Sequence, residues 1–139
     1  MTPGHRVVAA ARAAVRAKFR LHGRAVADGF DCIGLAAHAL AAGGFAGPVP
    51  TGYALRGGVP HQVAAMLDAA GLVRVGDTLA GDVLLLATGP GQLHLAIATE
   101  DGCIHADALL RRVVERPGAI PWPILGRWRL ADSTNETGA

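Results

Sequence analysis

The sequence predicts an α+β fold in which N-terminal helices pack on a central antiparallel β-sheet. Up to Gly71, apolar residues recur at the helical spacing and cap residues bound each segment. After Gly71 the chain changes to short apolar runs with turn signals between them. Helices followed by a run of strands is the order typical of α+β proteins. Because 139 residues suffice for one core, we expect a single domain over residues 1–130 and a flexible polar tail over residues 131–139.

The first half of the chain is predicted to form three helices. The first carries an apolar stripe along one face. Asp31 is placed as the N-cap of the second helix, and Gly43-Gly44 ends it. Pro60 suits the first turn of the third helix, which Gly71 closes. The helices cover residues 6–19, 31–42 and 60–70, and the loops between them cover residues 21–30 and 45–59.

The second half is predicted to form an antiparallel sheet. Residues 82–87 (DVLLLA) are a continuous apolar run, which suits a central strand. Residues 93–99 alternate, with Leu93 and Ile97 on one face and His94 on the other. The dipeptide Asp101-Gly102 is a strong hairpin turn signal. The predicted strands cover residues 72–75, 82–87, 93–99, 103–106, 109–115 and 124–130.

The composition excludes several classes of protein. Charged residues make up 17% of the chain, the net charge is +2 and aromatics are 4%, so we expect no nucleic-acid partner. Two cysteines cannot form a disulfide scaffold or a four-thiolate zinc site, and we expect no metal or other cofactor. Charged residues interrupt residues 1–24 and no apolar window is long enough to span a membrane. We therefore expect synthesis without a signal peptide and no membrane span.

The strongest candidate for catalysis is Cys32, in the first turn of the predicted second helix. Unpaired backbone N–H groups and the positive end of the helix dipole favour a thiolate at this position. The same N–H groups can stabilise an oxyanion formed by attack on a carbonyl group. The small Gly34 leaves room for an extended substrate. Taken alone, a cysteine here is more often a small buried hydrophobic residue.

A thiol nucleophile needs a base, and the base needs an orienting group, for which His94 and His105 are the candidates. His94 lies on the small-residue face of its strand, against which we expect the helix N-terminus to pack. A strict two-residue turn at Asp101-Gly102 would hold the two histidines roughly 13 Å apart. We therefore expect a wider turn or a bulge, with Asp107 as the alternative orienting group.

Four sequence blocks, taken together, resemble the NlpC-type cell-wall cysteine peptidases, a papain-like family. They are FDCIGL (residues 30–35), GDVLLL (81–86), LHLAI (93–97) and IHAD (104–107), in the family's order and spacing. The branch found in phage tails and gene transfer agents is the more similar one. The resemblance covers about residues 5–130, which is nearly the whole chain.

This resemblance implies a papain-like α+β fold with Cys32 as nucleophile, His94 as base and His105 as the third polar residue. It implies a peptidoglycan stem peptide as substrate, cut between the γ-carboxyl group of D-glutamate and the diamino acid. It also implies phage-tail or gene-transfer-agent proteins as partners. The protein would be made in the bacterial cytoplasm and act at the cell wall or periplasm as part of a tail particle.

The residues beside the nucleophile are expected to form the substrate-binding side of the site. Ile33 stands where many relatives carry serine, and His22, in the loop before the helix, is a candidate for binding a carboxylate. The family's tyrosine ahead of the cysteine loop is replaced by Phe19, which lacks the hydroxyl group. The candidates for substrate contact are Asp31, Ile33, Gly34, His22 and Tyr53, the last as the chain's only tyrosine.

Two other functions remain open on the same residues. A catalytically silent tail-tip or baseplate hub would keep the fold, with a blocked cleft and a partner surface such as the loop at residues 45–59. A thiol acyltransferase or deamidase would also use Cys32. The width and charge of the cleft distinguish these enzymes, because an open basic groove suits anionic peptides and a narrow apolar tunnel suits acyl groups.

Overall fold

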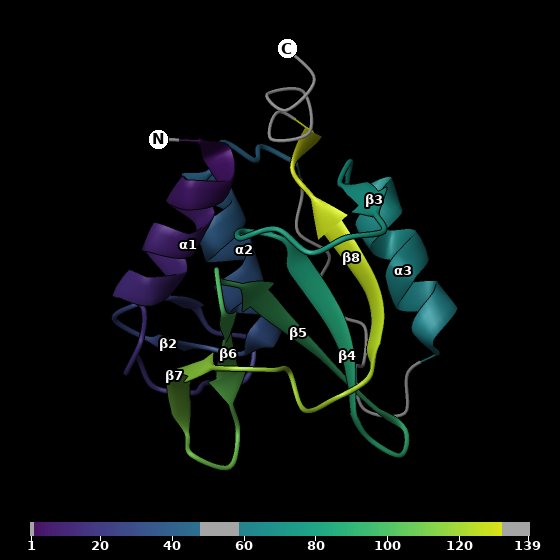
Figure 1. The fold of residues 1–139 in the computed structure, drawn as a ribbon. Helices are drawn as coiled ribbons and strands as arrows, with labels where there is room; N and C mark the ends of the chain where they lie inside the picture. The colour runs from purple at the N-terminus through teal and green to yellow at the C-terminus, as the bar shows by residue number, and fades with distance from the viewer. Residues whose placement is uncertain (1, 48–58, 132–139) are drawn as a thin grey trace.

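A six-stranded antiparallel sheet with three helices on one of its faces forms the structure (Figure 1), a computed structural model that describes residues 2–47 and 59–131. The strand order is β3-β8-β4-β5-β6-β7, and every neighbouring pair is antiparallel. The predicted α+β class is therefore confirmed. The strands of this sheet are β3 (Val73–Val75), β4 (Val83–Gly89), β5 (Gln92–Ala98), β6 (Gly102–Asp107), β7 (Arg112–Pro117) and β8 (Ile124–Arg129).

The first helix, α1 (Pro3–Ala13), begins and ends earlier than the predicted residues 6–19. The hydroxyl of Thr2 accepts a hydrogen bond from the His5 N–H, and Pro3 occupies the first turn, where its missing N–H costs nothing. The helix cannot continue to residue 19 because Lys18 forms a β-bridge with Arg112 on the sheet. Tertiary pairing thus outweighs the local helical pattern in this segment.

The predicted loop at residues 21–30 contains a small hairpin, β1 (Arg24–Ala25) with β2 (Gly29–Phe30). Gly29 has a φ of +103°, and a Cβ atom there would lie 2.5 Å from the carbonyl oxygen of Lys18. Only glycine fits a backbone that is both left-handed and this close to its neighbour. The hairpin leads directly into the second helix.

The other two helices agree with the sequence prediction. Helix α2 (Cys32–Ala42) has Asp31 as its N-cap, whose side chain accepts the Gly34 N–H. Helix α3 (Pro60–Ala69) begins with proline and is followed by Gly71 at a φ of +98°. Of the loop predicted at residues 45–59, residues 48–58 lie outside the described part of the chain. No helix within residues 2–47 and 59–131 is long and apolar enough to cross a membrane.

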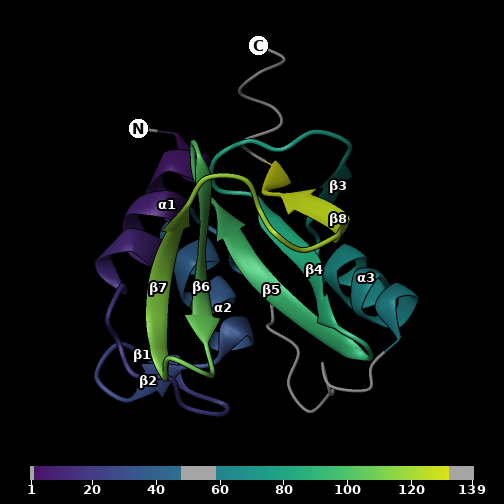
Figure 2. The same cartoon turned by 60° about the horizontal axis from the view of Figure 1, so that its bottom comes forward.

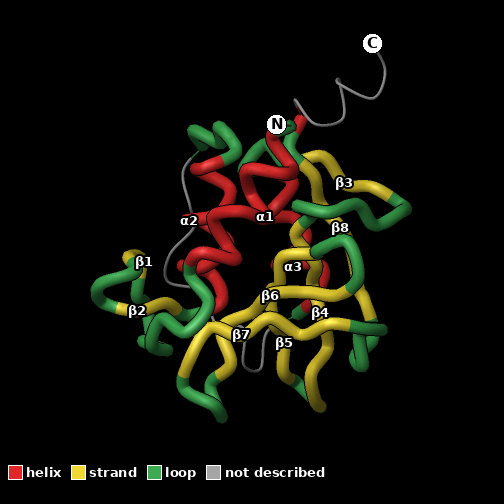
Figure 3. The backbone as a smooth tube through the Cα atoms, turned by 60° about the vertical axis from the view of Figure 1, so that its left-hand side comes forward, coloured by secondary structure: helices red, strands yellow, loops and turns green. Residues whose placement is uncertain are grey.

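Apolar side chains cover both faces of the sheet. The inner face packs against all three helices, and Figure 3 shows α1 and α2 in red on one side of the strands. On the outer face, the segment after β7 supplies the partly buried Ile120, Trp122 and Ile124. Buried strand residues of the inner layer include Leu93, Leu95, Ile97, Ile104 and Val113, and those of the outer layer are Leu84, Leu86, Ala96, Ala98 and Cys103.

Strand β7 begins at Arg112 rather than at the predicted residue 109. The carboxylate of Asp107 accepts hydrogen bonds from the backbone N–H groups of Leu109 and Leu110, at 2.9 and 3.1 Å. Such a side-chain bond to the following backbone stabilises a turn in place of a strand. The chain then passes through Arg111, at a φ of +58°, into β7.

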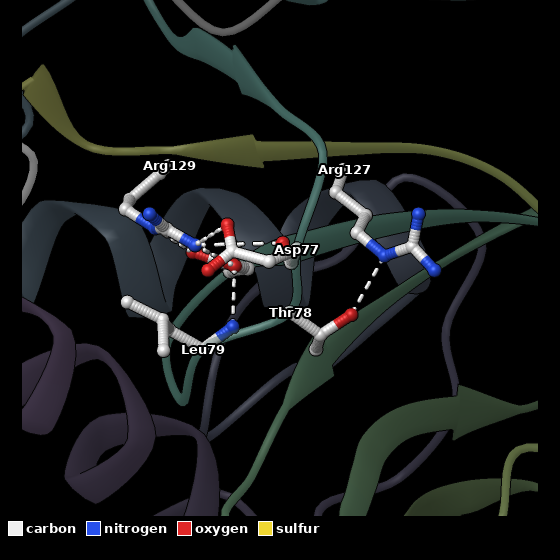
Figure 4. Close-up of polar contacts among 6 residues, drawn as sticks. Asp77, Thr78, Leu79, Arg127 and Arg129 are labelled. Carbon is white, nitrogen blue, oxygen red and sulfur yellow. Dashed lines mark hydrogen bonds and ion pairs between the residues drawn. The ribbon is translucent and has the colours of Figure 1, made fainter.

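A buried ion pair joins β8 to the loop between β3 and β4 (Figure 4). The Arg129 guanidinium donates to both carboxylate oxygens of Asp82, at 2.9 and 3.0 Å, and also reaches Asp77. The Asp82 side chain is only 1% exposed, whereas that of Asp77 is 71% exposed. Asp82 also accepts the Leu79 N–H, so one carboxylate organises the whole loop.

Asp82→Asn is expected to lower the free energy of unfolding by about 3 kcal/mol, because it leaves the buried Arg129 guanidinium without its buried counterion and with only the exposed Asp77. The matched control Asp77→Asn removes an exposed partner of the same guanidinium and should cost less than about 1 kcal/mol. Urea denaturation followed by circular dichroism measures both values. Equal losses in the two variants would contradict the assignment.

Candidate active site

Cys32 is the first residue of α2 and lies against the sheet with 6% of its surface exposed. Its helix begins here because the buried Asp31 caps the Gly34 N–H at 2.8 Å. The same carboxylate accepts the backbone N–H of His22 at 2.8 Å, which anchors the preceding loop to the helix start. The carboxylate of the residue before the nucleophile candidate therefore joins the helix start to the preceding loop.

The thiol of Cys32 meets the middle of β5, where the backbone N–H group of Leu95 faces the sulfur and favours its thiolate form. The register explains why this N–H is available. The Ala98 N–H donates to the carbonyl oxygen of Asp82, toward β4. Because N–H groups alternate in direction along a strand, those of Leu95 and Ile97 point toward β6. The pairing of β5 with β6 ends at Ile97 and Ile104, leaving Leu95 beyond the ladder. The thiol thus takes the place of a strand partner.

His94, the residue before Leu95, forms a direct contact with His105 of β6. Its Nε2 atom lies 2.9 Å from Nδ1 of His105, and the two rings are perpendicular. Four residues, 99–102, connect the paired residues Ala98 and Cys103, so the turn is wider than two residues, as expected. The register shifts by two positions and brings the histidines close enough to hydrogen-bond.

The turn between β5 and β6 is fixed by its own hydrogen bonds. Thr99 donates its N–H to the carbonyl oxygen of Gly102 and accepts the Gly102 N–H on its hydroxyl, both at 2.9 Å. A Cβ atom at Gly102 would overlap the carbonyl oxygen of Arg116 on β7. The wide turn therefore depends on glycine at this position, beside a third strand.

The expected packing face of β5 was wrong. The apolar residues of α2 share the inner layer with Leu93, Leu95 and Ile97, rather than with the small-residue face. The larger side chains bury more apolar area against the helix, which explains the choice. Figure 2 shows β5 and β6 in front of α2, with the two strands diverging. His94 lies on the other face of β5, with Ala96 and Ala98, so the thiol approaches the strand from the inner side at the Leu95 N–H, where the strands separate.

Burial sets the charge state of the resting site. It raises the pKa of the Cys32 thiol to about 12, although the N–H groups of Leu95, Cys32 and Ile33 act in the opposite direction. Burial also lowers the pKa of His94 to about 4, with a further contribution from the charge of His105. Desolvation therefore outweighs the effect of the helix N-terminus, which was expected to favour a thiolate. At neutral pH both groups are uncharged.

Two residues that the sequence did not single out, Trp122 and Arg116, lie close to His105. The edge of its ring meets Trp122, with centroids 5.4 Å apart, and the guanidinium of Arg116 lies 5.5 Å from the Trp122 ring centroid. Burial lowers the pKa of His105, Asp107 raises it, and Arg116 lowers it. Asp107 acts on His105 through its charge, because its carboxylate accepts the hydrogen bonds of the Leu109 and Leu110 N–H groups in the turn. No sequence signal links Trp122 to a histidine on another strand.

The remaining predicted site residues have mixed positions. Gly34 is buried, and Ile33 is half-buried against the inner core. The His22 side chain is exposed, and the backbone of His22 is left-handed, with a φ of +62°. Phe19 is half-buried and bridges Phe30, directly ahead of the cap and nucleophile. Tyr53 lies outside the described residues.

The second cysteine is separate from the first. Cys32 belongs to the inner layer and Cys103 to the outer layer, and both are free thiols. Burial raises the pKa of Cys103, while the nearby charge of Arg116 lowers it. Within residues 2–47 and 59–131, no group of three His, Cys, Asp or Glu side chains is placed to hold a metal ion.

Comparison with known proteins places the fold among NlpC/p60 domains. No family model and no curated relative matches the chain. NlpC2 from Trichomonas vaginalis superposes with a TM-score of 0.66 at 18% identity, over 92% of this chain and 48% of that one. The P60 domain of an antigen from M. avium subspecies paratuberculosis superposes with a TM-score of 0.64 at 17% identity, over 94% of this chain and 95% of that domain. The NlpC/p60 domain of the peptidoglycan hydrolase SagA superposes with a TM-score of 0.57 at 24% identity, over 82% of this chain and 88% of that domain.

These likenesses establish the NlpC/p60 fold for the chain, in agreement with the fold that the sequence resemblance implies. The chain spans about half the length of the Trichomonas vaginalis proteins, 48% of NlpC2 and 45% of NlpC1. With the P60 domain from M. avium subspecies paratuberculosis it matches nearly end to end. The shared part is therefore the domain described above.

Alkylation of Cys32 by iodoacetamide is expected to be slow at pH 7 and to accelerate steadily above pH 9, because only the thiolate reacts and the pKa is about 12. Peptide mass spectrometry after timed quenching measures the rate at each cysteine, with Cys103→Ser removing the second thiol. A fast, level rate between pH 6 and pH 8 would instead show a resting thiolate–imidazolium pair.

Arg116→Met is expected to raise the pKa of His105, because it removes the cation that disfavours the protonated ring. Titration of the histidine ring signals by NMR measures the shift. The matched variant Arg127→Met removes a cation from β8, across the sheet, and should leave the His105 titration unchanged. The same titration curve in both variants would exclude an effect of Arg116.

Proposed function

We propose that this protein is a cysteine endopeptidase that hydrolyses an amide bond in peptidoglycan stem peptides. The single observation that carries the proposal is the 2.9 Å contact between His94 Nε2 and His105 Nδ1, at the point where the Cys32 thiol meets β5. Nucleophilic catalysis needs a thiol, a base that takes its proton and a group that orients the base, and we assign these roles to Cys32, His94 and His105.

The proton transfer follows from which ring nitrogen is engaged. Because Nε2 of His94 contacts His105, Nδ1 is the atom left to take the proton of the Cys32 thiol. His105 must then be neutral, with its Nδ1 accepting a hydrogen bond from the His94 imidazolium. The surroundings that lower the pKa of His105 favour this neutral form. At rest the Cys32 thiol and the His94 imidazole are both neutral, so substrate binding has to make the proton transfer between them favourable.

In the proposed reaction, the Cys32 sulfur attacks the carbonyl carbon of the scissile amide as its proton passes to His94. The oxyanion forms at the start of α2, where the Cys32 backbone N–H and the helix dipole stabilise it. His94 then gives its proton to the departing amine. Water, deprotonated by His94, hydrolyses the thioester and regenerates the thiol.

The substrate class comes from the relatives and from the sequence resemblance. Two of the similar structures are named as peptidoglycan hydrolases, SagA and the Mycobacterium tuberculosis protein RipB. RipB superposes with a TM-score of 0.60 at 19% identity over 92% of this chain. The four sequence blocks support the bond between the γ-carboxyl group of D-glutamate and the diamino acid. We extend that substrate and bond to this chain as part of the proposal.

The proposed site of action is the cell wall or periplasm. The resemblance of the sequence to the phage-tail and gene-transfer-agent branch supports delivery by a tail particle, with tail proteins as partners. Synthesis in the bacterial cytoplasm is part of the same proposal.

One observation favours a second function, that of a catalytically silent hub in a tail. Cys32 is 6% exposed, and burial holds its pKa far above neutrality, as for a structural cysteine. A hub needs no reactive thiol and only keeps the fold. The same digestion experiment separates the two functions.

The wild-type protein is expected to cleave one amide of a diaminopimelate-type muropeptide, with products identified by mass spectrometry, and Cys32→Ala should abolish cleavage. Cys103→Ala is the matched control, because it removes the other thiol from the outer layer and should retain activity. Digestions at several values between pH 5 and pH 9, with reductant, cover the working range. No cleavage by the wild type under any condition would favour the hub.

His94→Ala should lower kcat by a factor of about 10³ or more, because it removes the proton acceptor. His105→Ala should lower it about 10- to 100-fold, and His105→Gln should restore part of the loss, because an amide oxygen can accept the same hydrogen bond. Steady-state kinetics on the same muropeptide measures these changes. A His105→Ala enzyme with wild-type kcat would remove His105 from the site.

A further inference from the structure

Two segments far apart in the sequence form one exposed surface at the β7 edge of the sheet. Residues 16–21 run beside residues 109–113, and we call these two segments the leucine–arginine ribbon. The Arg16 N–H donates to the carbonyl oxygen of Val113 at 2.8 Å, and the Phe19 N–H donates to that of Arg111 at 2.9 Å. Their relative position is therefore fixed by backbone hydrogen bonds.

Three leucines of the leucine–arginine ribbon face solvent. Leu109 is 95% exposed, Leu21 is 69% exposed and Leu110 is 56% exposed, which are the three largest values among the exposed large hydrophobic residues described. The turn that carries Leu109 and Leu110 projects from the lower edge of the molecule between β6 and β7 (Figure 1). The Asp107 carboxylate holds this turn in shape. The leucines are thus displayed by an ordered turn.

The same ribbon concentrates positive charge. It carries five of the chain's 13 Lys and Arg residues, all exposed: Arg16, Lys18, Arg20, Arg111 and Arg112. In the described part of the chain, none of the five forms an ion pair. By contrast, Arg12 pairs with Glu115 at 2.8 Å and Arg129 with Asp82 at 2.9 Å. The chain's net charge of +2 therefore conceals one strongly basic surface.

We infer that the leucine–arginine ribbon docks on the surface of an anionic lipid bilayer, with Leu109 and Leu110 inserted into the interfacial layer. The cations behind the turn would lie at the level of the lipid headgroups, which attract lysine and arginine. Charge complementarity selects an anionic partner, and the exposed leucines select one with an apolar interior. This inference is independent of the proposed peptidase activity.

A bilayer fits this surface better than other anionic partners do. A nucleic acid or an anionic polysaccharide would satisfy the five cations and leave the leucines in water. A stable protein interface buries about 800 Å² per partner around aromatic anchors. The only aromatic residue of the ribbon, Phe19, is half-buried in the protein's own core. A convex turn with two leucines at its tip is easily surrounded by lipid.

Sedimentation of the full-length protein with vesicles tests the inference. One set of vesicles is an equimolar mixture of phosphatidylcholine and phosphatidylglycerol, and the other is phosphatidylcholine alone. Binding to the anionic vesicles is expected, with little binding to the neutral ones and a loss on adding salt. Leu109→Gln/Leu110→Gln and Arg111→Glu/Arg112→Glu should each lower the binding constant at least about tenfold.

The matched controls lie toward the opposite, β3 edge of the sheet. Leu79→Gln changes a leucine that is 42% exposed, and Arg127→Glu changes a cation of β8, so both should bind vesicles like the wild type. Thermal unfolding verifies that each variant is folded. Equal binding to both kinds of vesicle, or anionic binding that the leucine variant leaves unchanged, would overturn the inference.

Discussion

The contact between the start of α2 and the middle of β5 is the constraint on which the candidate site depends. The ladder between β5 and β6 ends at Ile97, so the Leu95 N–H has no partner on β6 and faces the Cys32 sulfur instead. The start of the helix therefore meets the sheet at the point where the ladder ends. The same divergence leaves His94 and His105 facing each other across the separated strands. The same break in the sheet ladder thus underlies both the approach of Cys32 to β5 and the contact between the two histidines.

Burial is the second determinant of the site, and it opposes the helix N-terminus. Desolvation raises the pKa of the Cys32 thiol and lowers that of His94, so the resting pair is uncharged. An uncharged pair is cheaper to bury than an ion pair, which must lose its hydration. The proposed reaction therefore begins with proton transfer, and a bound substrate has to make that transfer favourable.

Strand β6 connects the chemistry to the rest of the surface. Its middle carries His105, which meets Trp122 from the outer layer, and its end carries Asp107, which shapes the exposed turn. The adjacent β7 supplies Arg116 beside Trp122. The exposed turn between β6 and β7 therefore begins only two residues after His105, on the same strand as the histidine contact.

The sequence by itself determined the α+β class, the N-cap at Asp31, the helix starting at Cys32 and the need for a wide turn before His105, because these depend on local spacing and turn chemistry. Only the tertiary structure decided where α1 ends, since Lys18 pairs with a strand more than 90 residues later. It also decided which face of β5 meets α2 and brought Trp122 onto His105. The tertiary structure also decided the charge state of Cys32. The helix start is a local feature, but the burial that raises the thiol pKa depends on every element packed around it.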